Sequence, residues 1–238
     1  MNDTFPKPQA DAPLVVFDFD NTLYDGDSGS HLFAWLLKRN PMRIAAALAA
    51  TPLLGLLVAM LSTRRLGISG YVWIATFGLH RVRDFNEWVN RYVALHQDDI
   101  QRRLLPVALE VLAKHRAAGD RVIVATGAPP ELAKAILAFV AHQDIPVIGS
   151  QVGACWGAIT ATRHCHNREK MRMLRERGYG DIAVAYSDSV ADLPLLKAAK
   201  MPVVVNPKAS SIKVFRRELP ADTPMLNWGC SERGGSSD

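Results

Sequence analysis

In the second half of the chain, short apolar runs alternate with segments in which apolar residues recur at helical spacing. The apolar runs predict buried strands at 121–125, 145–148, 182–186 and 203–205. The segments around them predict helices at 106–119, 130–140, 168–177 and 193–199. One more apolar run, 14–17, predicts a buried strand near the start of the chain. Because strands that alternate with helices form a parallel sheet covered on both faces, the expected fold class is α/β.

Residues 28–100 break this alternation and carry almost only helical patterns. They include a predicted helix at 32–38 and two apolar segments at 44–61 and 66–79. Asp84 is placed to cap a further helix, whose apolar and aromatic positions are Trp88, Val89, Tyr92, Val93 and His96. We interpret 28–100 as a helical cap inserted into the sheet domain.

The insertion makes the predicted core discontinuous, with one part at 12–27 and the other at 101–222. Within the second part, residues 151–160 are interrupted by glycine and are compatible with a short hairpin. The last segment, 223–238, is rich in glycine and serine near its end, and we expect it to be a flexible tail.

Polar side chains follow three of the predicted strands, where parallel sheets bind their ligands. Asp18 and Asp20 follow the first strand, Thr126 follows 121–125, and Asp188 and Asp192 follow 182–186. Each residue alone is compatible with an ordinary turn or helix cap. Acidic side chains that share one edge repel each other unless a cation neutralises them, and Mg²⁺ is the simplest ion that prefers oxygen ligands.

These positions resemble the motifs of the haloacid dehalogenase-like (HAD) phosphatase superfamily. The matching segments are DFDNT at 18–22, the strand ending in Thr126-Gly127, Lys170, and SDSVAD at 187–192. The resemblance implies a Rossmann-like core with a helical cap of the C1 type, a phosphomonoesterase activity and a Mg²⁺ cofactor. Asn21 and Ser187 stand where the family often has glycine, and neither replaces a reacting group.

The resemblance also implies a role for each residue. Asp18 would be the nucleophile that forms an aspartyl-phosphate, and Asp20 would be the general acid and base. The implied phosphate-binding residues are Thr126, Gly127 and Lys170, and the implied metal site is Asp18, Asp20, Asp188 and Asp192. Asp27 lies where the cap begins and would either contact the substrate or cap a helix.

The segment 44–61 has eighteen residues without a charge. As a helix it would be about 27 Å long, close to the bilayer core of about 30 Å. A single crossing would separate Asp18 from Thr126 and Asp188, which must meet at one site. Arginines also flank the segment on both sides, at 39, 43, 64 and 65.

Three arrangements of 44–79 remain compatible with these observations: a shallow membrane hairpin, a pair of interfacial helices, or a buried cap helix. We favour membrane contact, because a cap of this size supplies little apolar cover for a helix that is apolar on all sides. The expected location is therefore the cytoplasm, at the cytoplasmic face of the membrane.

The cap also bears on the substrate. It begins directly after the first motif, as in the phosphoserine phosphatase-like branch, and DGDSGSHLFAWLLKRNPMR resembles the phosphatidylglycerophosphatase C-type enzymes. The expected substrate is a membrane lipid phosphate such as phosphatidylglycerophosphate. The alternatives are a soluble phosphatase of phosphoserine or another small metabolite, and an inactive membrane-binding module on a phosphatase fold.

Composition excludes several other classes of function. The net charge of +5 favours anionic partners, but no run of lysine and arginine is long enough to predict nucleic-acid binding. The three cysteines argue against a disulfide framework. His164, Cys165 and His166 do not match a zinc pattern, and we interpret them as a link to the helix that carries Lys170. The first residues contain no secretory signal, which favours a cytosolic protein.

Overall fold

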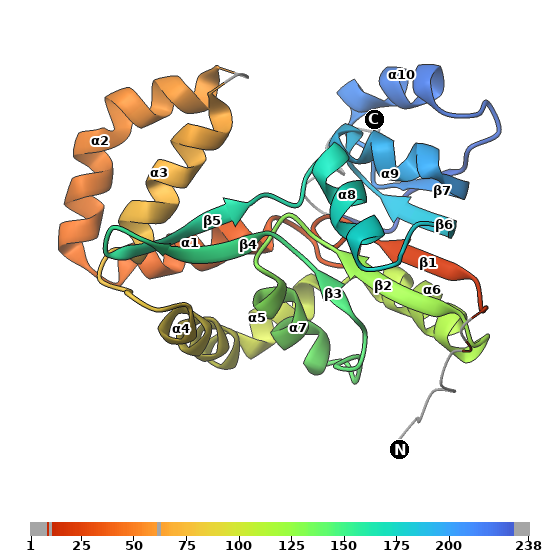
Figure 1. The fold of residues 1–238 in the computed structure, drawn as a ribbon, viewed down its shortest axis with the longest axis horizontal. Coiled ribbons are helices and arrows are strands. Elements are labelled where there is room, and N and C mark those ends of the chain that lie inside the picture. The colour runs from red at the N-terminus through yellow and green to blue at the C-terminus, as the bar shows by residue number, and fades with distance from the viewer. Residues whose placement is uncertain (1–8, 10, 61–62, 231–238) are drawn as a thin grey trace.

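The core of the fold is a sheet of six parallel strands (Figure 1). The computed structural model describes residue 9, residues 11–60 and residues 63–230. In spatial order the strands are β3 (Val147–Ile148), β2 (Arg121–Ala125), β1 (Leu14–Phe17), β6 (Ile182–Ser187), β7 (Ala199–Val205) and β8 (Met225–Leu226). The predicted α/β fold with a parallel sheet is therefore confirmed, and β1 and β2 have the predicted bounds.

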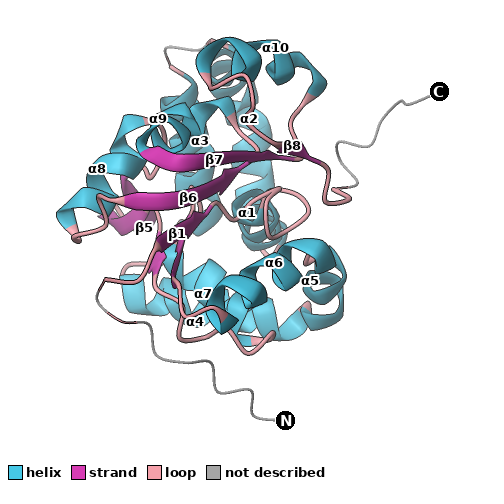
Figure 2. Cartoon of the chain, turned by 90° about the vertical axis from the view of Figure 1, so that its right-hand side faces the viewer, coloured by secondary structure: helices cyan, strands magenta, loops and turns pink. Residues whose placement is uncertain are grey.

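Helices cover both faces of the sheet, as the edge-on view in Figure 2 shows. On one face, Val15 and Phe17 of β1 pack in a core with α6 (Pro106–Ala117) and α7 (Pro130–Ala138). On the other face, Leu14 and Val16 pack in a second core with α8 (Arg168–Glu176), α9 (Leu193–Ala198) and α10 (Ala209–Glu218). Successive strand residues point to opposite faces, so the continuous apolar runs of the sequence fill both cores.

The cap consists of helices and a hairpin. Its helices are α1 (Ser28–Lys38), α2 (Pro41–Ala59), α3 (Arg64–Thr76), α4 (Val82–Leu95) and α5 (Gln97–Arg103). The predicted hairpin is present as β4 (Gln151–Cys155) and β5 (Ala158–Arg163), which pair antiparallel. Thr76 Oγ1 donates to the Ile159 carbonyl at 2.7 Å, and Trp73 Nε1 donates to the Cys155 carbonyl at 3.1 Å. The hairpin therefore holds the base of α3, although it is far from the cap in sequence.

Helices α2 and α3 form an arm that projects from the rest of the molecule (Figure 1). Asn40 caps α2 by accepting a hydrogen bond from Met42 N at 2.9 Å, and Pro41 occupies its first turn. A Cβ on Gly67 or Gly70 of α3 would collide with Val58 or Leu54 of α2, so these glycines permit the close packing of the two helices. The helix predicted at 44–61 corresponds to α2, which begins three residues earlier, at Pro41, and ends at Ala59. Residue 61, the last of the predicted helix, lies outside the described part of the chain.

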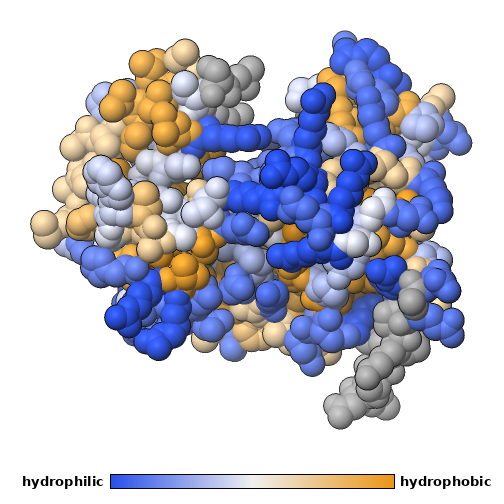
Figure 3. Space-filling model, in the orientation of Figure 1, coloured by the Kyte–Doolittle hydropathy of each residue, from blue (hydrophilic) through white to orange (hydrophobic). Residues whose placement is uncertain are grey.

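One face of α2 remains exposed. Among the described helices, α2 is long and apolar enough to cross a membrane. Only 6% of its most apolar 18-residue stretch is buried inside the protein. Leu48, Leu53 and Leu56 are 69%, 64% and 60% exposed. Figure 3 shows hydrophobic residues gathered over this arm, whereas hydrophilic residues dominate the surface beside it. The arrangement with a buried cap helix is therefore wrong for α2.

Two of the arginines that flank the apolar segment are used inside the protein. Arg43 donates to the carbonyls of Leu36 and Phe77, which joins the bases of the cap helices. The Arg39 guanidinium lies 5.0 Å from the ring centre of Trp35 and 5.1 Å from that of Trp88. Arg39 and Arg43 therefore lie at the base of the arm. Arg64 and Arg65 are the first residues of α3 and lie at the far end of the arm.

The C-terminal segment differs from the prediction. Residues 223–230 are not a flexible tail, because β8 extends the sheet beside β7 and both Trp228 and Cys230 are buried. Apolar burial in this segment outweighs its glycine and serine content. Residues 231–238 lie outside the described part. The α4 prediction also needs a small correction, because Asp84 lies in the first turn of α4 and the N-cap residue is Arg81.

Candidate active site

The carboxyl ends of β1, β2 and β6 open into a cavity of about 400 Å³ between the sheet and the cap. Its lining includes seven of the eight site residues predicted from the sequence: Asp18, Asp20, Asp27, Gly127, Lys170, Asp188 and Asp192. Thr126, the eighth, is fully buried next to Gly127, and its hydroxyl lies 3.5 Å from Asp20 Oδ2. The structure therefore brings the predicted residues together from four separate parts of the chain.

Lys170 is the centre of a buried ionic cluster at the floor of the cavity. Its Nζ donates to Asp18 Oδ1 at 2.8 Å and to Asp192 Oδ2 at 2.6 Å. Asp192 Oδ2 also accepts a hydrogen bond from the Ser187 hydroxyl at 2.8 Å. Helix α8 has its buried face over the sheet, and this orientation directs Lys170 towards the end of β1. Lys170 is only 1% exposed as a residue, so its ion pairs are shielded from water.

The surroundings of Asp18 and Asp20 raise the pKa of both carboxyl groups. Burial raises the pKa of Asp18 from 3.8 to about 6, although the Lys170 charge opposes the shift. Burial, followed by the nearby Asp27 carboxylate, raises the pKa of Asp20 to about 7. Asp20 Oδ1 accepts a hydrogen bond from Ser28 N at 2.8 Å, which fixes the carboxyl group at the start of α1. One acid of the pair can thus exchange a proton near neutral pH.

The turn after β2 is held in place by its neighbours. Thr126 N donates to the Ile148 carbonyl at 2.8 Å, and the Ser150 hydroxyl donates to the Gly127 carbonyl at 2.6 Å. Ser150 Oγ in turn accepts from Cys165 N at 3.0 Å. A Cβ on residue 127 would collide with the His166 imidazole, so glycine is required for this approach. Sequence analysis did not identify Ser150 or His166 as part of the site.

Asp27 is both a helix cap and a cavity residue. Its Oδ1 accepts from Ser30 N at 2.7 Å and caps α1, while the residue also lines the cavity. The two interpretations offered by the sequence are therefore compatible with each other.

No group of three or more His, Cys, Asp and Glu side chains in the described residues is arranged to hold a metal ion. His164, Cys165 and His166 lie between the end of β5 and the start of α8. A metal at the cavity floor would also use oxygen ligands other than side chains, such as the Asp20 carbonyl. Asp192 contributes to the site by holding Lys170, and its predicted contact with a metal stays a prediction.

Asn206, after β7, joins the C-terminal segment to the turn that follows β1. Its Nδ2 donates to the Asn21 carbonyl at 2.8 Å, and its Oδ1 accepts from Trp228 N at 2.6 Å. Cys230 Sγ approaches Asp25 Oδ1 at 2.9 Å in the same region. Nothing in the sequence around β7 indicates that Asn206 joins these segments, because its partners Asn21 and Trp228 are far from each other in the chain.

Replacing Asn206 with alanine is expected to lower the free energy of unfolding by about 1–3 kcal/mol. The change leaves buried backbone groups of Asn21 and Trp228 without their partner, and alanine tolerates the positive φ of residue 206 poorly. Urea unfolding measures the effect. Asn206→Asp keeps the acceptor for Trp228 N and should recover part of the loss. A wild-type midpoint for Asn206→Ala would contradict this account.

Comparisons with known proteins agree with this geometry. A family model described as haloacid dehalogenase-like hydrolase matches residues 15–197. A Bordetella pertussis Tohama I protein of unknown function is similar in structure, with a TM-score of 0.67 and 20% identity over 91% of this chain and 99% of that chain. Phosphoserine phosphatase from T. onnurineus, in complex with NDSB-201, has a TM-score of 0.52 and 19% identity over 93% and 92%. A phosphoserine phosphatase solved as a phospho-aspartyl intermediate analogue has a TM-score of 0.54 and 14% identity over 94% of each chain. At these identities the solved structures share the fold with this chain.

Proposed function

The chain belongs to the haloacid dehalogenase-like hydrolase family, and we propose that it is a Mg²⁺-dependent phosphomonoesterase of membrane lipid phosphates that works through an aspartyl-phosphate. The observation that carries the proposal is the pair Asp18 and Asp20 at the cavity floor, with Lys170 bound to Asp18. A nucleophilic carboxylate, an acid that titrates near neutral pH and a buried cation are the groups that phosphoryl transfer requires.

In the first step, a carboxylate oxygen of Asp18 attacks phosphorus, and the bond between phosphorus and the substrate oxygen breaks. The Asp20 carboxyl group gives its proton to that leaving oxygen. Its raised pKa, caused by burial and by Asp27, keeps the proton available near neutral pH. Lys170 binds Asp18 Oδ1 and keeps the carboxylate in place for attack through its other oxygen.

In the second step, the Asp20 carboxylate takes a proton from a water molecule, which attacks the phosphorus of the aspartyl-phosphate. The bond to Asp18 breaks, and inorganic phosphate leaves with the Asp18 carboxylate regenerated. The Lys170 ammonium and the backbone N–H groups around Thr126 and Gly127 favour the negative charge that develops on the phosphoryl oxygens. The hydrogen bond from the Ser150 hydroxyl to Gly127 keeps this turn fixed.

The oxygen donors at the cavity floor fit Mg²⁺. Asp18, Asp20 and Asp188 line the same cavity, and the carboxylates of Asp18 and Asp188 together with the Asp20 backbone carbonyl would hold the ion. When bound there, Mg²⁺ would neutralise phosphoryl charge and orient the phosphate.

Incubation with EDTA is expected to remove more than about 90% of the phosphate release, since the cavity floor would keep repelling acids. Added Mg²⁺ should restore the activity, whereas Ca²⁺, with its longer bonds and flexible geometry, should restore little. Phosphate release from a soluble phosphomonoester measures both effects. Full activity after dialysis against EDTA would contradict the metal requirement.

The arm formed by α2 and α3 supports a lipid substrate. Its exposed leucines offer an apolar face, and Ile68 and Val72 of α3 line the catalytic cavity. A phosphate headgroup could therefore enter the cavity while the apolar face of α2 lies on the membrane. Insertion of the tip is less favourable, because Arg64 and Arg65 would enter the hydrocarbon core. We infer a side-on contact at the cytoplasmic face of the membrane, in which α2 lies in the interface.

A soluble small-molecule phosphatase is the second candidate. The size of the cavity, about 400 Å³, and the fold shared with phosphoserine phosphatases favour it. An inactive membrane-binding module is a poor alternative, because the proposed reacting groups are all present in one cavity.

A phosphate-release screen distinguishes these candidates. The purified protein would receive phosphatidylglycerophosphate and phosphatidic acid dispersed in detergent, and phosphoserine and glycerol 3-phosphate in the same buffer. We expect the lipid phosphates to have the higher kcat/KM. Preference for a soluble phosphomonoester would support the second candidate, and release from none of them would overturn the proposed activity.

A further inference from the structure

Arg65, in the first turn of α3 on the cap, is one of the residues that line the catalytic cavity. It lines the cavity together with Ile68 and Val72 of α3 and with His164 and His166, which follow β5. The Asn167 amide can link the two sides, with its nitrogen donating to the Ala191 carbonyl at 2.9 Å and its oxygen accepting from Arg65 Nη2 at 3.3 Å. Arg65 itself is exposed, and this bond would keep its guanidinium at the mouth of the cavity that it lines.

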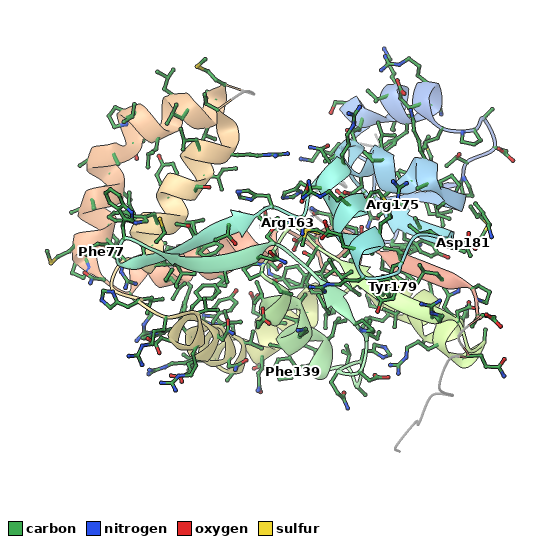
Figure 4. The ribbon with its side chains drawn as sticks, viewed as in Figure 1. Phe77, Phe139, Arg163, Arg175, Tyr179 and Asp181 are labelled. Atoms are coloured by element: carbon green, nitrogen blue, oxygen red, sulfur yellow. The ribbon has the colours of Figure 1, made fainter. Side chains whose placement is uncertain are left out.

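Arg65 has no ion-pair partner among the described residues, whereas Arg163, which Figure 4 labels on β5, pairs with Glu169 and Glu176. Two acids of the cavity floor, Asp18 and Asp192, are paired with Lys170 instead. His164 is half-buried, and its pKa is lowered by burial and by the Arg65 charge. The imidazoles of His164 and His166 therefore offer N–H donors beside Arg65 and add no negative charge to the cavity.

We infer that Arg65, with His164 and His166, forms a subsite for a second anionic group of the substrate, separate from the phosphate that is cleaved. The inference rests on the proposed phosphomonoesterase activity and narrows its substrate class to phosphomonoesters that also carry a phosphodiester. Arg65 provides a planar pair of N–H donors that matches two oxygens of such a group. His166 lies against Gly127, so the subsite continues directly from the turn that would hold the cleaved phosphate.

The position of the subsite determines how far the second anionic group must lie from the cleaved phosphate. The cavity extends from the sheet edge to α3, so the second group must be several bonds away from the cleaved phosphate. The apolar side chains of Ile68 and Val72 next to Arg65 would contact the carbon chain between the two groups or beyond them. A membrane lipid headgroup and a soluble diester phosphate share this chemistry.

Matched soluble probes test the subsite without any membrane. Glycerol 3-phosphate carrying a methyl phosphate diester at its far hydroxyl supplies both anions, and 1-O-methylglycerol 3-phosphate supplies only the cleaved one. The preference is the ratio of kcat/KM for the first probe to that for the second. We expect Arg65→Met to lower this ratio by about 10- to 100-fold, the effect of one charged hydrogen-bond pair. Arg65→Lys should retain part of the preference.

Arg83→Met is the matched control, because Arg83 is an exposed arginine of the cap, with 75% of its side chain accessible, and is not part of the cavity lining. It should change the ratio by less than about twofold. 3-Phosphoglycerate serves as the carboxylate probe, and a wild-type preference for it equal to that for the diester would overturn the assignment to a phosphodiester.

Calorimetric binding to Asp18→Asn separates this inference from the proposed activity. The diester probe should bind this variant more weakly by about 10- to 100-fold when Arg65→Met is added. Equal binding with and without Arg65, or no binding of the diester probe, would overturn the subsite. Binding that depends on Arg65 in a protein whose wild type releases no phosphate would support the subsite and overturn the phosphatase instead. Vesicles containing phosphatidylglycerophosphate, compared with the soluble diester, then show which source the enzyme uses.

Discussion

Asp18→Asn is expected to reduce phosphate release by roughly 10³-fold or more while the protein keeps its fold. Asparagine has almost the same shape as aspartate but is a poor nucleophile, so the aspartyl-phosphate cannot form. Its side-chain oxygen can still accept the hydrogen bond from Lys170 that Asp18 Oδ1 accepts at 2.8 Å. The measurement is steady-state release of phosphate from the best substrate of the screen.

The same variant should unfold at no lower temperature than the wild type at pH 7 to 8. Burial raises the pKa of Asp18 from 3.8 to about 6, so the folded state binds this proton more tightly than the unfolded state does. Any stabilisation from the bound proton is present at low pH and is lost as the pH rises through about 6. Asparagine resembles the protonated acid and avoids the cost of a buried carboxylate.

Asp181→Asn is a matched control, because Asp181, which Figure 4 labels, is an exposed aspartate with an ion pair to Lys200. It should leave both phosphate release and the melting temperature close to wild type. Near-normal release by Asp18→Asn would contradict the nucleophile assignment. A large loss of melting temperature in Asp18→Asn would instead show that the carboxylate stabilises the fold.

The sheet was predictable because its strands are continuous apolar runs. The predicted and observed bounds of β1 and β2 coincide, since a polar residue directly follows each run. Strand β7 starts at Ala199, four residues before the predicted strand, because its exposed first residues pair with β6 without an apolar signal. Strand β8 has two residues, which are too few for any pattern, and the composition around it suggested a tail.

The candidate site was predictable where its chemistry follows a strand. The acids at the ends of β1 and β6 are adjacent to their strands in sequence, so parallel topology alone brings them to one edge. Arg65, Ser150 and Asn206 could not be found in this way, because each acts through contacts with segments more than twenty residues away. Such contacts depend on how the cap and the C-terminal segment pack, which residue patterns do not specify.

The exposed face of α2 leads to a prediction about membranes. Residues 53–57 include four leucines, and the structure divides them into two pairs. Leu54 packs against Gly70 and Leu57 is partly covered, so only Leu53 and Leu56 of this group are exposed. Leu48 is exposed one to two turns earlier on the same helix. A variant that tests membrane contact without disturbing the packing of α2 on α3 should therefore change Leu48, Leu53 and Leu56.

Replacing these three leucines with serine is expected to weaken binding to anionic vesicles by about 100-fold, since each partly inserted leucine contributes about 1 kcal/mol. Activity on a dispersed lipid phosphate should fall with it, whereas activity on glycerol 3-phosphate should remain, because none of the three lines the cavity.

The matched control changes Leu95, Val107 and Phe139, which are exposed on other helices or at their ends, to serine. Co-sedimentation with vesicles of phosphatidylglycerol and phosphatidylcholine measures the binding, and added salt should reduce only its electrostatic part, which comes from the net charge of +5. If the wild type stays in the supernatant, α2 is not a membrane surface, and the soluble phosphatase becomes the better proposal.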